Sequence, residues 1–155
     1  MQFLKEGLKL IELSENLALH AYKDVGGIFT IGWGHTKDVK EGDSCTESLA
    51  TQWLMEDIQE AIRLTRHALQ VTLNNNQFTA LVSLTFNIGY GNLLKSNVLK
   101  LIHESKFYEA ADAFLELDHD HKTGLEVAGL RNRRESERTL FLKPIQPVII
   151  PAKKA

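Results

Sequence analysis

The sequence predicts an α+β fold, in which one small β-hairpin accompanies a larger set of helices. Apolar residues recur at helical spacing near the N-terminus and again over most of the chain after residue 46. Between these regions lie two short β-prone runs, residues 19–23 and 28–32, on either side of the turn-forming Val25-Gly26-Gly27. With no internal repeat in the sequence, we expect one domain or two small lobes.

The composition is typical of a soluble globular protein. The chain has 155 residues, of which 43% are hydrophobic and 25% charged, and no apolar run approaches the length that spans a bilayer. Cys45 is the single cysteine, so an intramolecular disulfide is excluded and packing must supply the stability. Because Lys5 and Glu6 stand where a signal peptide needs its apolar core, we expect no export signal.

The first predicted helix has about three turns and ends near Glu15. Its apolar positions are Leu4, Leu8, Ile11 and Leu13. The hairpin follows, with residues 19–23 and 28–32 as its arms. We expect a third strand to begin at Val39, before residues 41–44 turn the chain.

The next predicted helix is long and runs to about Ala68. Ser44 and Glu47 stand at the spacing of a capping box, in which each side chain accepts a hydrogen bond from the other residue's backbone, so we expect the helix to begin there. Its buried face is predicted to hold Leu49, Trp53, Leu54, Ile58, Ala61 and Ile62.

Shorter helices are predicted beyond it. Asn75 or Asn76 can cap a helix that Gly89 and Gly91 are expected to end. Ser96 then restarts the helical pattern, which continues in two amphipathic segments.

The last part of the chain is predicted to be a loop over residues 117–126, a helix over about 130–142 and a tail. Prolines follow the helix at 144, 147 and 151, and a proline-rich end with few apolar neighbours is rarely held in place. We therefore expect residues 143–155 to form a flexible basic tail.

Two carboxylates and a hydroxyl around the hairpin are the candidate catalytic groups. Glu15 closes a helix, whereas Asp24 precedes the turn and Thr30 lies on the returning strand. A helix end that faces a hairpin can hold two acids across a crevice in unlike environments, as cleavage of a glycosidic bond requires. The helix C-terminus disfavours a negative charge on Glu15, which favours a proton-donating role for it.

This segment resembles the phage-type lysozymes, or endolysins, of glycoside hydrolase family 24. In that family a Glu is followed nine residues later by an Asp and then six later by a Thr, inside a pattern that ends Thr-Ile-Gly-x-Gly-His; residues 15, 24 and 30 reproduce it. Asn16 departs from the Gly that usually follows the Glu. Further similarity over residues 1–142 lies at 45–47, 75–81, 86–89, 129–134, Glu137, Leu140 and Phe141.

The resemblance implies a lysozyme-like catalytic domain over residues 1–142. Its small lobe would take about residues 13–45, and its helical lobe about residues 46–142 together with the N-terminal helix, with the long helix joining the two. It further implies hydrolysis of the β-1,4 bond between N-acetylmuramic acid and N-acetylglucosamine in peptidoglycan by inversion. Glu15 would be the general acid, and Asp24 the general base that holds water together with Thr30.

The biology of the family supplies further expectations. The enzyme would lyse the host cell at the end of phage infection, without a cofactor and as a monomer. Lacking an export segment, it would accumulate in the host cytoplasm and reach the wall through a holin.

Residues on both lobes are candidates for binding the sugar chain. Gly32 and Gly34 would let a sugar approach the strand backbone, although they could instead only bend the sheet. Phe86, Asn87 and Ile88 resemble the wall of the opposite lobe, although Asn87 could equally belong to a helix end.

The resemblance implies that His35 forms a structural pair with Asp57 rather than acting in catalysis, and such a partner would lower the pKa of Asp57. The stretch Asp118-His119-Asp120-His121 lacks the regular spacing of a metal site, so we expect a solvated loop and no metal.

Charge is unevenly distributed along the chain. Residues 129–155 carry a net charge of +5 and residues 1–128 a net charge of −7. A basic terminal helix and tail could contact the anionic bacterial envelope, or the charges could merely be solvated; no nucleic-acid motif accompanies them. One arginine among Arg131, Arg133 and Arg134 is expected to reach Glu15, and the other two are expected to be surface charge.

Two alternatives to an enzyme stay open at this point. One is a non-catalytic peptidoglycan-binding protein that has the lysozyme fold. The other is an envelope-perturbing activity of the basic C-terminus.

Overall fold

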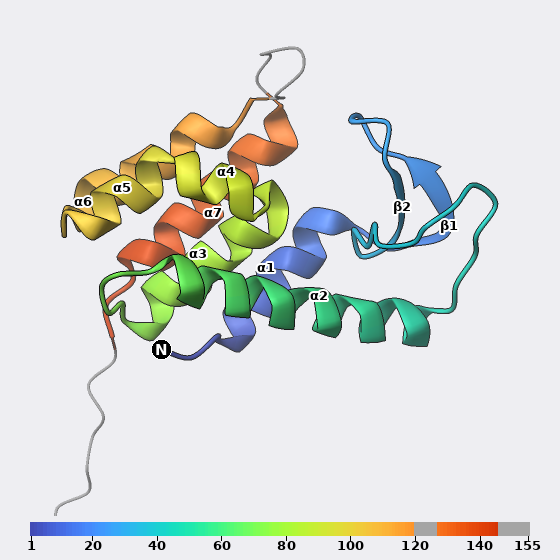
Figure 1. The fold of residues 1–155 in the computed structure, drawn as a ribbon, viewed down its shortest axis with the longest axis horizontal. Coiled ribbons are helices and arrows are strands. Elements are labelled where there is room, and N and C mark those ends of the chain that lie inside the picture. Colours follow the sequence, from blue (N-terminus) through green and yellow to red (C-terminus); the bar gives the residue numbers. More distant parts are fainter. Residues whose placement is uncertain (120–126, 146–155) are drawn as a thin grey trace, which may run out of the picture.

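The structure, a computed structural model, describes residues 1–119 and 127–145. Figure 1 shows a two-stranded hairpin on one side of the molecule and a group of helices on the other, with the longest helix, α2, running along both. This arrangement confirms the predicted α+β class. The helices are α1 (Lys5–Glu15), α2 (Glu47–Ala68), α3 (Asn75–Ile88), α4 (Tyr90–Lys95), α5 (Asn97–His103), α6 (Phe107–Ala113), the 3₁₀ helix η1 (Phe114–Leu117) and α7 (Ala128–Leu142).

The hairpin consists of β1 (Ala18–Lys23) and β2 (Phe29–Gly32), which pair antiparallel. Tyr22 lies opposite Thr30, and the register of the pair shifts between Ala18 and Tyr22. The predicted third strand at Val39 is wrong. The chain instead turns there, and Ser44 forms an isolated bridge with His20.

Helix α2 does not begin with the predicted capping box at Ser44. Thr46, not Ser44, is the N-cap, and its side chain accepts a hydrogen bond from the backbone N–H of Leu49. The backbone on both sides of Ser44 is bonded to β1, since the carbonyl of Asp43 accepts from Ala21 and the N–H of Cys45 donates to Leu19, so the helix starts two residues later than a cap at Ser44 would place it. From there α2 contacts β2 at one end and α3 at the other, and so joins the two lobes.

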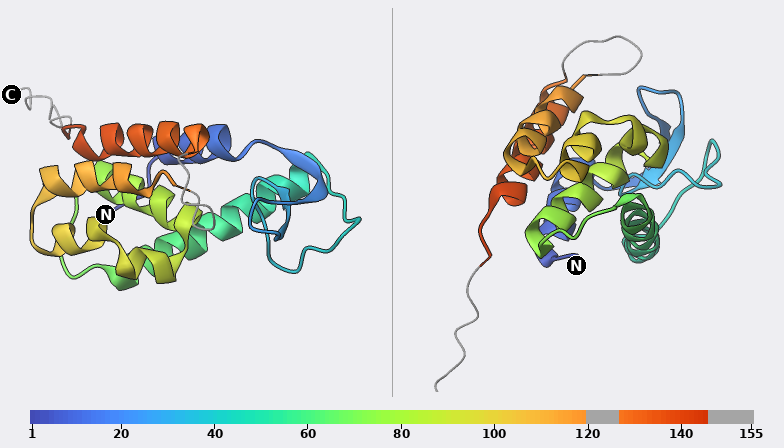
Figure 2. Two further views of the ribbon diagram at one scale, coloured as in Figure 1. Left: turned by 90° about the horizontal axis from the view of Figure 1, so that it is seen from above. Right: turned by 60° about the vertical axis from the view of Figure 1, so that its left-hand side comes forward.

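Helix α3 is the centre of the helical lobe, where it packs against α1, α2 and α7 (Figure 2). The prediction of Asn75 or Asn76 as its N-cap is wrong. The cap is Asn74, which forms a capping box with Gln77. Gly89 ends α3 as predicted, with φ of 80°. The prediction for Gly91 is wrong, because this glycine lies inside α4.

The two ends of α7 are connected to the rest of the lobe. The backbone N–H of Val127 donates to the carbonyl of Asp118 at 2.9 Å, and Asn76 donates to the carbonyl of Lys143 at 2.9 Å. The first residue of the predicted flexible tail is therefore held against α3. The rest of the predicted tail from residue 146 on, and most of the predicted loop (residues 120–126), lie outside the described residues.

Candidate active site

Glu15 occupies the last position of α1, where the chain leaves the helix abruptly. Asn16, which follows it, has φ of 54° and ψ of 151°. This pair of angles lies outside the left-handed helical region that asparagine tolerates, in a region that is almost reserved for glycine. Asn16 therefore has a strained backbone at the position where the family usually has glycine.

The Glu15 carboxylate, at the end of α1, lies between two other segments of the chain. Arg133 of α7 donates from Nη1 to Oε1 at 2.5 Å. On the other side lies Gly34, just after β2: a Cβ added there would be 2.6 Å from Oε2. The side chain of Glu15 is 19% exposed, so the carboxylate is held between the lobes and still reaches solvent.

Asp24 is fixed by the turn that it begins. Its Oδ1 accepts a hydrogen bond from the backbone N–H of Ile28 at 2.9 Å, and its carbonyl accepts one from Gly27 at 2.9 Å. Oδ1 is therefore committed to the turn, and Oδ2 is the oxygen better placed to take a proton from a ligand.

The hydroxyl of Thr30 has a defined direction. Thr30 is buried, and its Oγ1 donates to the carbonyl of Ile28 at 3.0 Å. Because a hydroxyl has one proton, Thr30 can only accept from its next partner. A water molecule beside it would donate a proton to Thr30.

Tyr22 is a member of the site that sequence reasoning missed. Opposite residues of an antiparallel pair project on the same face, so Tyr22 lies beside Thr30. Burial raises the pKa of Tyr22, and the negative charges of Glu15 and Asp24 raise it further. The signal was available as the alternation of side chains along β1.

The predicted sugar-binding residues fall into two groups. A Cβ on Gly32 would lie 3.1 Å from Cβ of Ala50, so this glycine lets β2 pack on α2, which favours the structural explanation. Gly34 and Phe86, by contrast, line a groove of about 220 Å³ together with Thr36, Asp57 and Tyr90. Asn87 and Ile88 belong to neither group: they follow Phe86 at the end of α3 and are half-buried, but they are not among the residues that line this groove.

His35 and Asp57 lie in contact: Nδ1 of His35 is 2.8 Å from Oδ2 of Asp57. The His35 ring is buried and stacks on Trp53 with ring centroids 4.7 Å apart. The expected lowering of the pKa of Asp57 is wrong. Burial raises that pKa, and the hydrogen bond and charge of His35 only partly oppose the effect.

Behind Glu15 lies a buried cluster of charges on α7. Glu137 is fully buried, and its carboxylate accepts hydrogen bonds from Arg133 at 3.3 Å and from Ser83 at 2.7 Å. Arg134 is also fully buried; its Nε lies 3.1 Å from Glu137 Oε2. Burial raises the pKa of Glu137, against the opposing charges of the two arginines.

The sequence left open which arginine reaches Glu15; it is Arg133. Sequence reasoning also treated the neighbouring arginines as surface charge, which is wrong for Arg134. The signal was the spacing of Glu137 at three and four residues from the two arginines, on the face of α7 that also carries Leu140 and Phe141.

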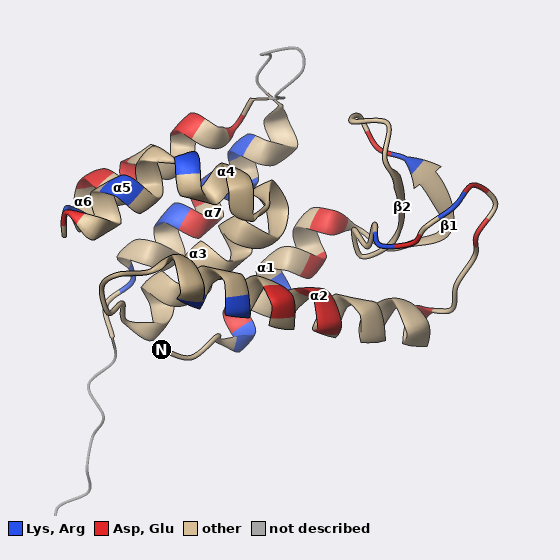
Figure 3. Cartoon of the chain, viewed as in Figure 1, with Lys and Arg blue, Asp and Glu red and all other residues tan. Residues whose placement is uncertain are grey.

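The other arginines of α7 are paired as well. Arg131 lies 3.0 Å from the buried Asp118, and Arg138 lies 2.8 Å from Asp112. Figure 3 shows Lys and Arg interspersed with Asp and Glu along this helix. In the described part of the chain, the positive charge of α7 is thus largely matched from within the protein.

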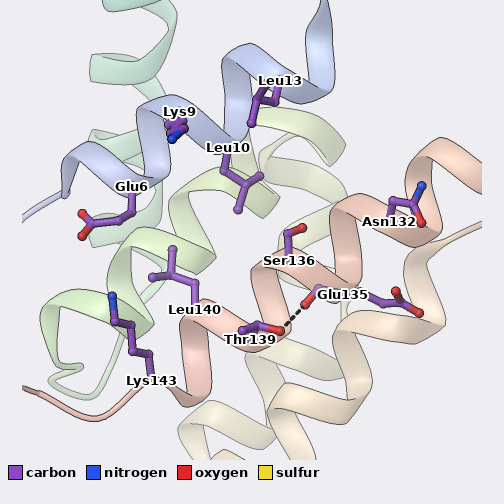
Figure 4. A pocket seen from close by; sticks show the side chains of 10 residues that line it. All are labelled: Glu6, Lys9, Leu10, Leu13, Asn132, Glu135, Ser136, Thr139, Leu140 and Lys143. Atoms are coloured by element: carbon purple, nitrogen blue, oxygen red, sulfur yellow. Dashed lines mark hydrogen bonds between the residues drawn. The ribbon is translucent and has the colours of Figure 1, made fainter.

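A larger groove, of about 670 Å³, lies between α1 and α7 (Figure 4). Glu6, Lys9, Leu10, Leu13 and Glu135 are among its lining residues, and none of the three candidate catalytic residues is. Over residues 1–119 and 127–145, no group of three or more side chains is arranged to hold a metal ion. Asp120 and His121 of the predicted solvated loop lie outside those ranges.

Known proteins with similar sequences are phage endolysins. The chain is 34% identical over 143 residues to the endolysin of Acyrthosiphon pisum secondary endosymbiont phage 1, covering 91% of this chain and 98% of that one. It is 37% identical over 147 residues to the endolysin of Salmonella phage P22, covering 92% and 99%. The SAR-endolysin of Pseudomonas phage phiKMV is 33% identical, with 89% of this chain and 85% of that one covered.

Solved structures agree in fold. The muramidase domain of SpmX from Asticaccaulis excentricus superposes with a TM-score of 0.84 at 34% identity, covering 92% of this chain and 99% of that one. The endolysin from Escherichia coli O157:H7 phage FAHEc1 gives a TM-score of 0.80 at 34% identity, covering 95% and 97%. The family model described as phage lysozyme matches residues 12–137. The chain therefore belongs to the phage lysozyme family.

Proposed function

We propose that this protein is a phage endolysin, a muramidase that hydrolyses the β-1,4 bond between N-acetylmuramic acid and N-acetylglucosamine in bacterial peptidoglycan. The observation that carries the proposal is the setting of Glu15, which is held by Arg133 beside a hairpin that presents Asp24 and Thr30. Membership of the phage lysozyme family supports it independently.

Glu15 acts as the general acid. Because Oε1 is bound by Arg133, the proton is carried by Oε2 and passes from there to the leaving oxygen of the glycosidic bond. After the proton has been transferred, the positive charge of Arg133 stabilises the negative carboxylate of Glu15. Positioned proton transfer of this kind contributes about 10² to 10⁴ in rate.

Asp24 and Thr30 together orient the attacking water. The water donates one proton to Thr30 Oγ1, whose own proton is committed to Ile28, and the other to Asp24, which removes it as the water attacks the anomeric carbon. Attack opposite the leaving group inverts the configuration. In inverting glycosidases the two carboxyl groups stand about 6.5–9.5 Å apart to leave room for that water. No cofactor takes part in this chemistry.

The sugar chain would run along the groove beyond Glu15, against Gly34 on one lobe and Phe86, Asn87 and Ile88 on the other. Phe86 and Ile88 supply apolar surface for sugar rings, and Asn87 supplies an amide for polar groups. Gly32 contributes through its packing on α2.

The protein lyses the host at the end of infection, as a monomer that gathers in the host cytoplasm and passes to the wall through a holin. Among the described residues, none of the helices is long and apolar enough to span a membrane. Since the arginines of α7 are paired internally, attraction to an anionic envelope depends on Lys143 and on tail residues outside the described part.

Mass analysis of digested, purified peptidoglycan tests the proposal. Wild type should release fragments with reducing N-acetylmuramic ends, whereas Glu15→Gln and Asp24→Asn should release almost none while still binding the wall. Glu41→Gln, an exposed change far from the three catalytic groups in sequence, is the matched control. Wild-type protein that binds the wall but cuts nothing would instead establish the non-catalytic alternative.

A further inference from the structure

Asn87 has one end of its side-chain amide occupied from inside the protein. Helices α3 and α7 pack side by side (Figure 1), and Arg134 Nη2 of α7 donates to Asn87 Oδ1 at 2.6 Å. A guanidinium group has donors only, so the atom that it faces must be the amide oxygen. The contact thus fixes which end of the amide is which, independently of how the two atoms are assigned.

The other end of the same amide is its NH₂ group, which remains available for another partner. Asn87 is half-buried, and within the described ranges its Nδ2 has no hydrogen-bond partner. An NH₂ group only donates, so this end offers donors and no acceptor. A ligand group that meets Asn87 from the solvent side must therefore be an acceptor.

Arg134 is fully buried, and its Nη2 bonds Asn87. Its Nε lies 3.1 Å from Oε2 of the fully buried Glu137, an ion pair without hydrogen-bond geometry, and its Nη1 makes no hydrogen bond among the described residues. Glu137 in turn contacts Arg133, the residue that binds Glu15. The general acid and Asn87 are therefore attached to one buried cluster, which keeps both in place relative to α7.

We propose that Arg134 is a positioning residue that holds Asn87 with its NH₂ group toward the glycan, so that this wall selects an acetamido carbonyl oxygen over an amino group. The inference rests on the proposed function, because the glycan must lie along the end of α3. An acetamido carbonyl only accepts, which matches the amide end that faces it. A de-N-acetylated sugar presents an ammonium group there, whose donors would meet the donors of Asn87.

Asn87→Asp is the sharpest test, because it exchanges the open donor for an acceptor at nearly the same shape. Its carboxylate can still accept from Arg134, now in a charge-assisted bond, so the melting temperature should equal or exceed that of wild type. Asn132→Asp is the matched control, since it adds the same charge at an exposed position of α7.

Binding is measured by cosedimentation with purified peptidoglycan, either fully N-acetylated or chemically de-N-acetylated, with every variant in a Glu15→Gln background. The parent and Asn132→Asp should favour the N-acetylated wall, and Asn87→Asp should bind that wall about tenfold more weakly and lose the preference. Arg134→Lys keeps the charge next to Glu137 but loses the planar fork. With Glu15 intact it should raise KM for the N-acetylated wall by a larger factor than it lowers kcat.

Asn87→Asp that keeps the parental preference overturns the inference, whatever Arg134→Lys does. Failure of the proposed function looks different. In that case the protein with Glu15 intact cuts neither wall, while the cosedimentation experiment still reports the preference and decides the role of Asn87.

Discussion

Arg133 Nη1 lies 2.5 Å from Glu15 Oε1, although 118 residues separate the two in sequence. The same guanidinium reaches Glu137 through Nε at 3.3 Å, and it is 4% exposed. The candidate acid at the end of α1 is thus attached directly to the buried charges of α7.

Replacing Arg133 by Met should destabilise the protein strongly. The change leaves the buried Glu137 with one cation fewer, and breaking a buried ion pair from one side typically costs about 3–5 kcal/mol. Arg138→Met is the matched control, because its partner Asp112 is exposed and such pairs contribute less than about 1 kcal/mol. Urea unfolding of both variants measures the difference, and equal losses would mean that the cluster behind Glu15 is not the source of the stability.

Gly34→Ala should reduce cleavage by more than its backbone strain explains. The position has φ of +81°, which costs an alanine about 1–2 kcal/mol, and the new Cβ would lie 2.6 Å from Glu15 Oε2, the oxygen proposed to carry the proton. Gly42→Ala separates the two effects, because Gly42 has φ of +85° and nothing within 4 Å of the added Cβ.

Gly34→Ala should lose at least as much free energy of unfolding as Gly42→Ala, while only Gly34→Ala should lose cleavage of purified peptidoglycan. If Gly42→Ala loses as much cleavage as Gly34→Ala, strain alone accounts for the effect and the close approach to Glu15 is unimportant.

Local sequence signals were enough to predict most of the elements and the position of Glu15. The helical spacing before it and the turn after Asp24 are short-range features, and α1, β1 and β2 appear where these features predicted them. Errors arose where several residues compete for one role. Asn74, Asn75 and Asn76 are all good caps, and the choice depends on which of them faces Gln77.

Tertiary pairing explains what the sequence could not supply. Arg134 and Glu137 are of types that usually lie at the surface, and only the packing of α7 against α3 shows that they are buried together. The pKa of Asp57 is raised rather than lowered for a similar reason. The sequence motif indicates its partner His35, but it does not indicate how much water the packing removes from the carboxylate.

Asp57 should make the protein less stable as pH rises through its folded pKa. A carboxyl group whose folded pKa is raised contributes fully below its unfolded pKa, about 3.9, and loses that contribution as it ionises in the folded state. Asp57→Asn cannot ionise, and its Oδ1 can still accept from His35. The melting temperature of Asp57→Asn minus that of wild type should therefore increase from pH 4 to pH 7. The exposed control Glu41→Gln should give a constant difference, and a difference for Asp57→Asn that shrinks with pH would mean that His35 dominates instead.

Thr30→Val tests the direction of the hydroxyl at the centre of the proposed mechanism. Valine fills the same space at this buried position but can neither donate to Ile28 nor accept from the attacking water. Loss of the bond to Ile28 should cost no more than about 1.5 kcal/mol, whereas cleavage should fall by about 10²-fold because the water is no longer oriented.

Thr30→Ser retains the oxygen and should keep most of the activity, which separates a role of the hydroxyl from a role of the methyl group. Rates on purified peptidoglycan decide the matter, and a valine variant as active as the serine variant would remove Thr30 from the water site and leave Asp24 to orient the nucleophile alone.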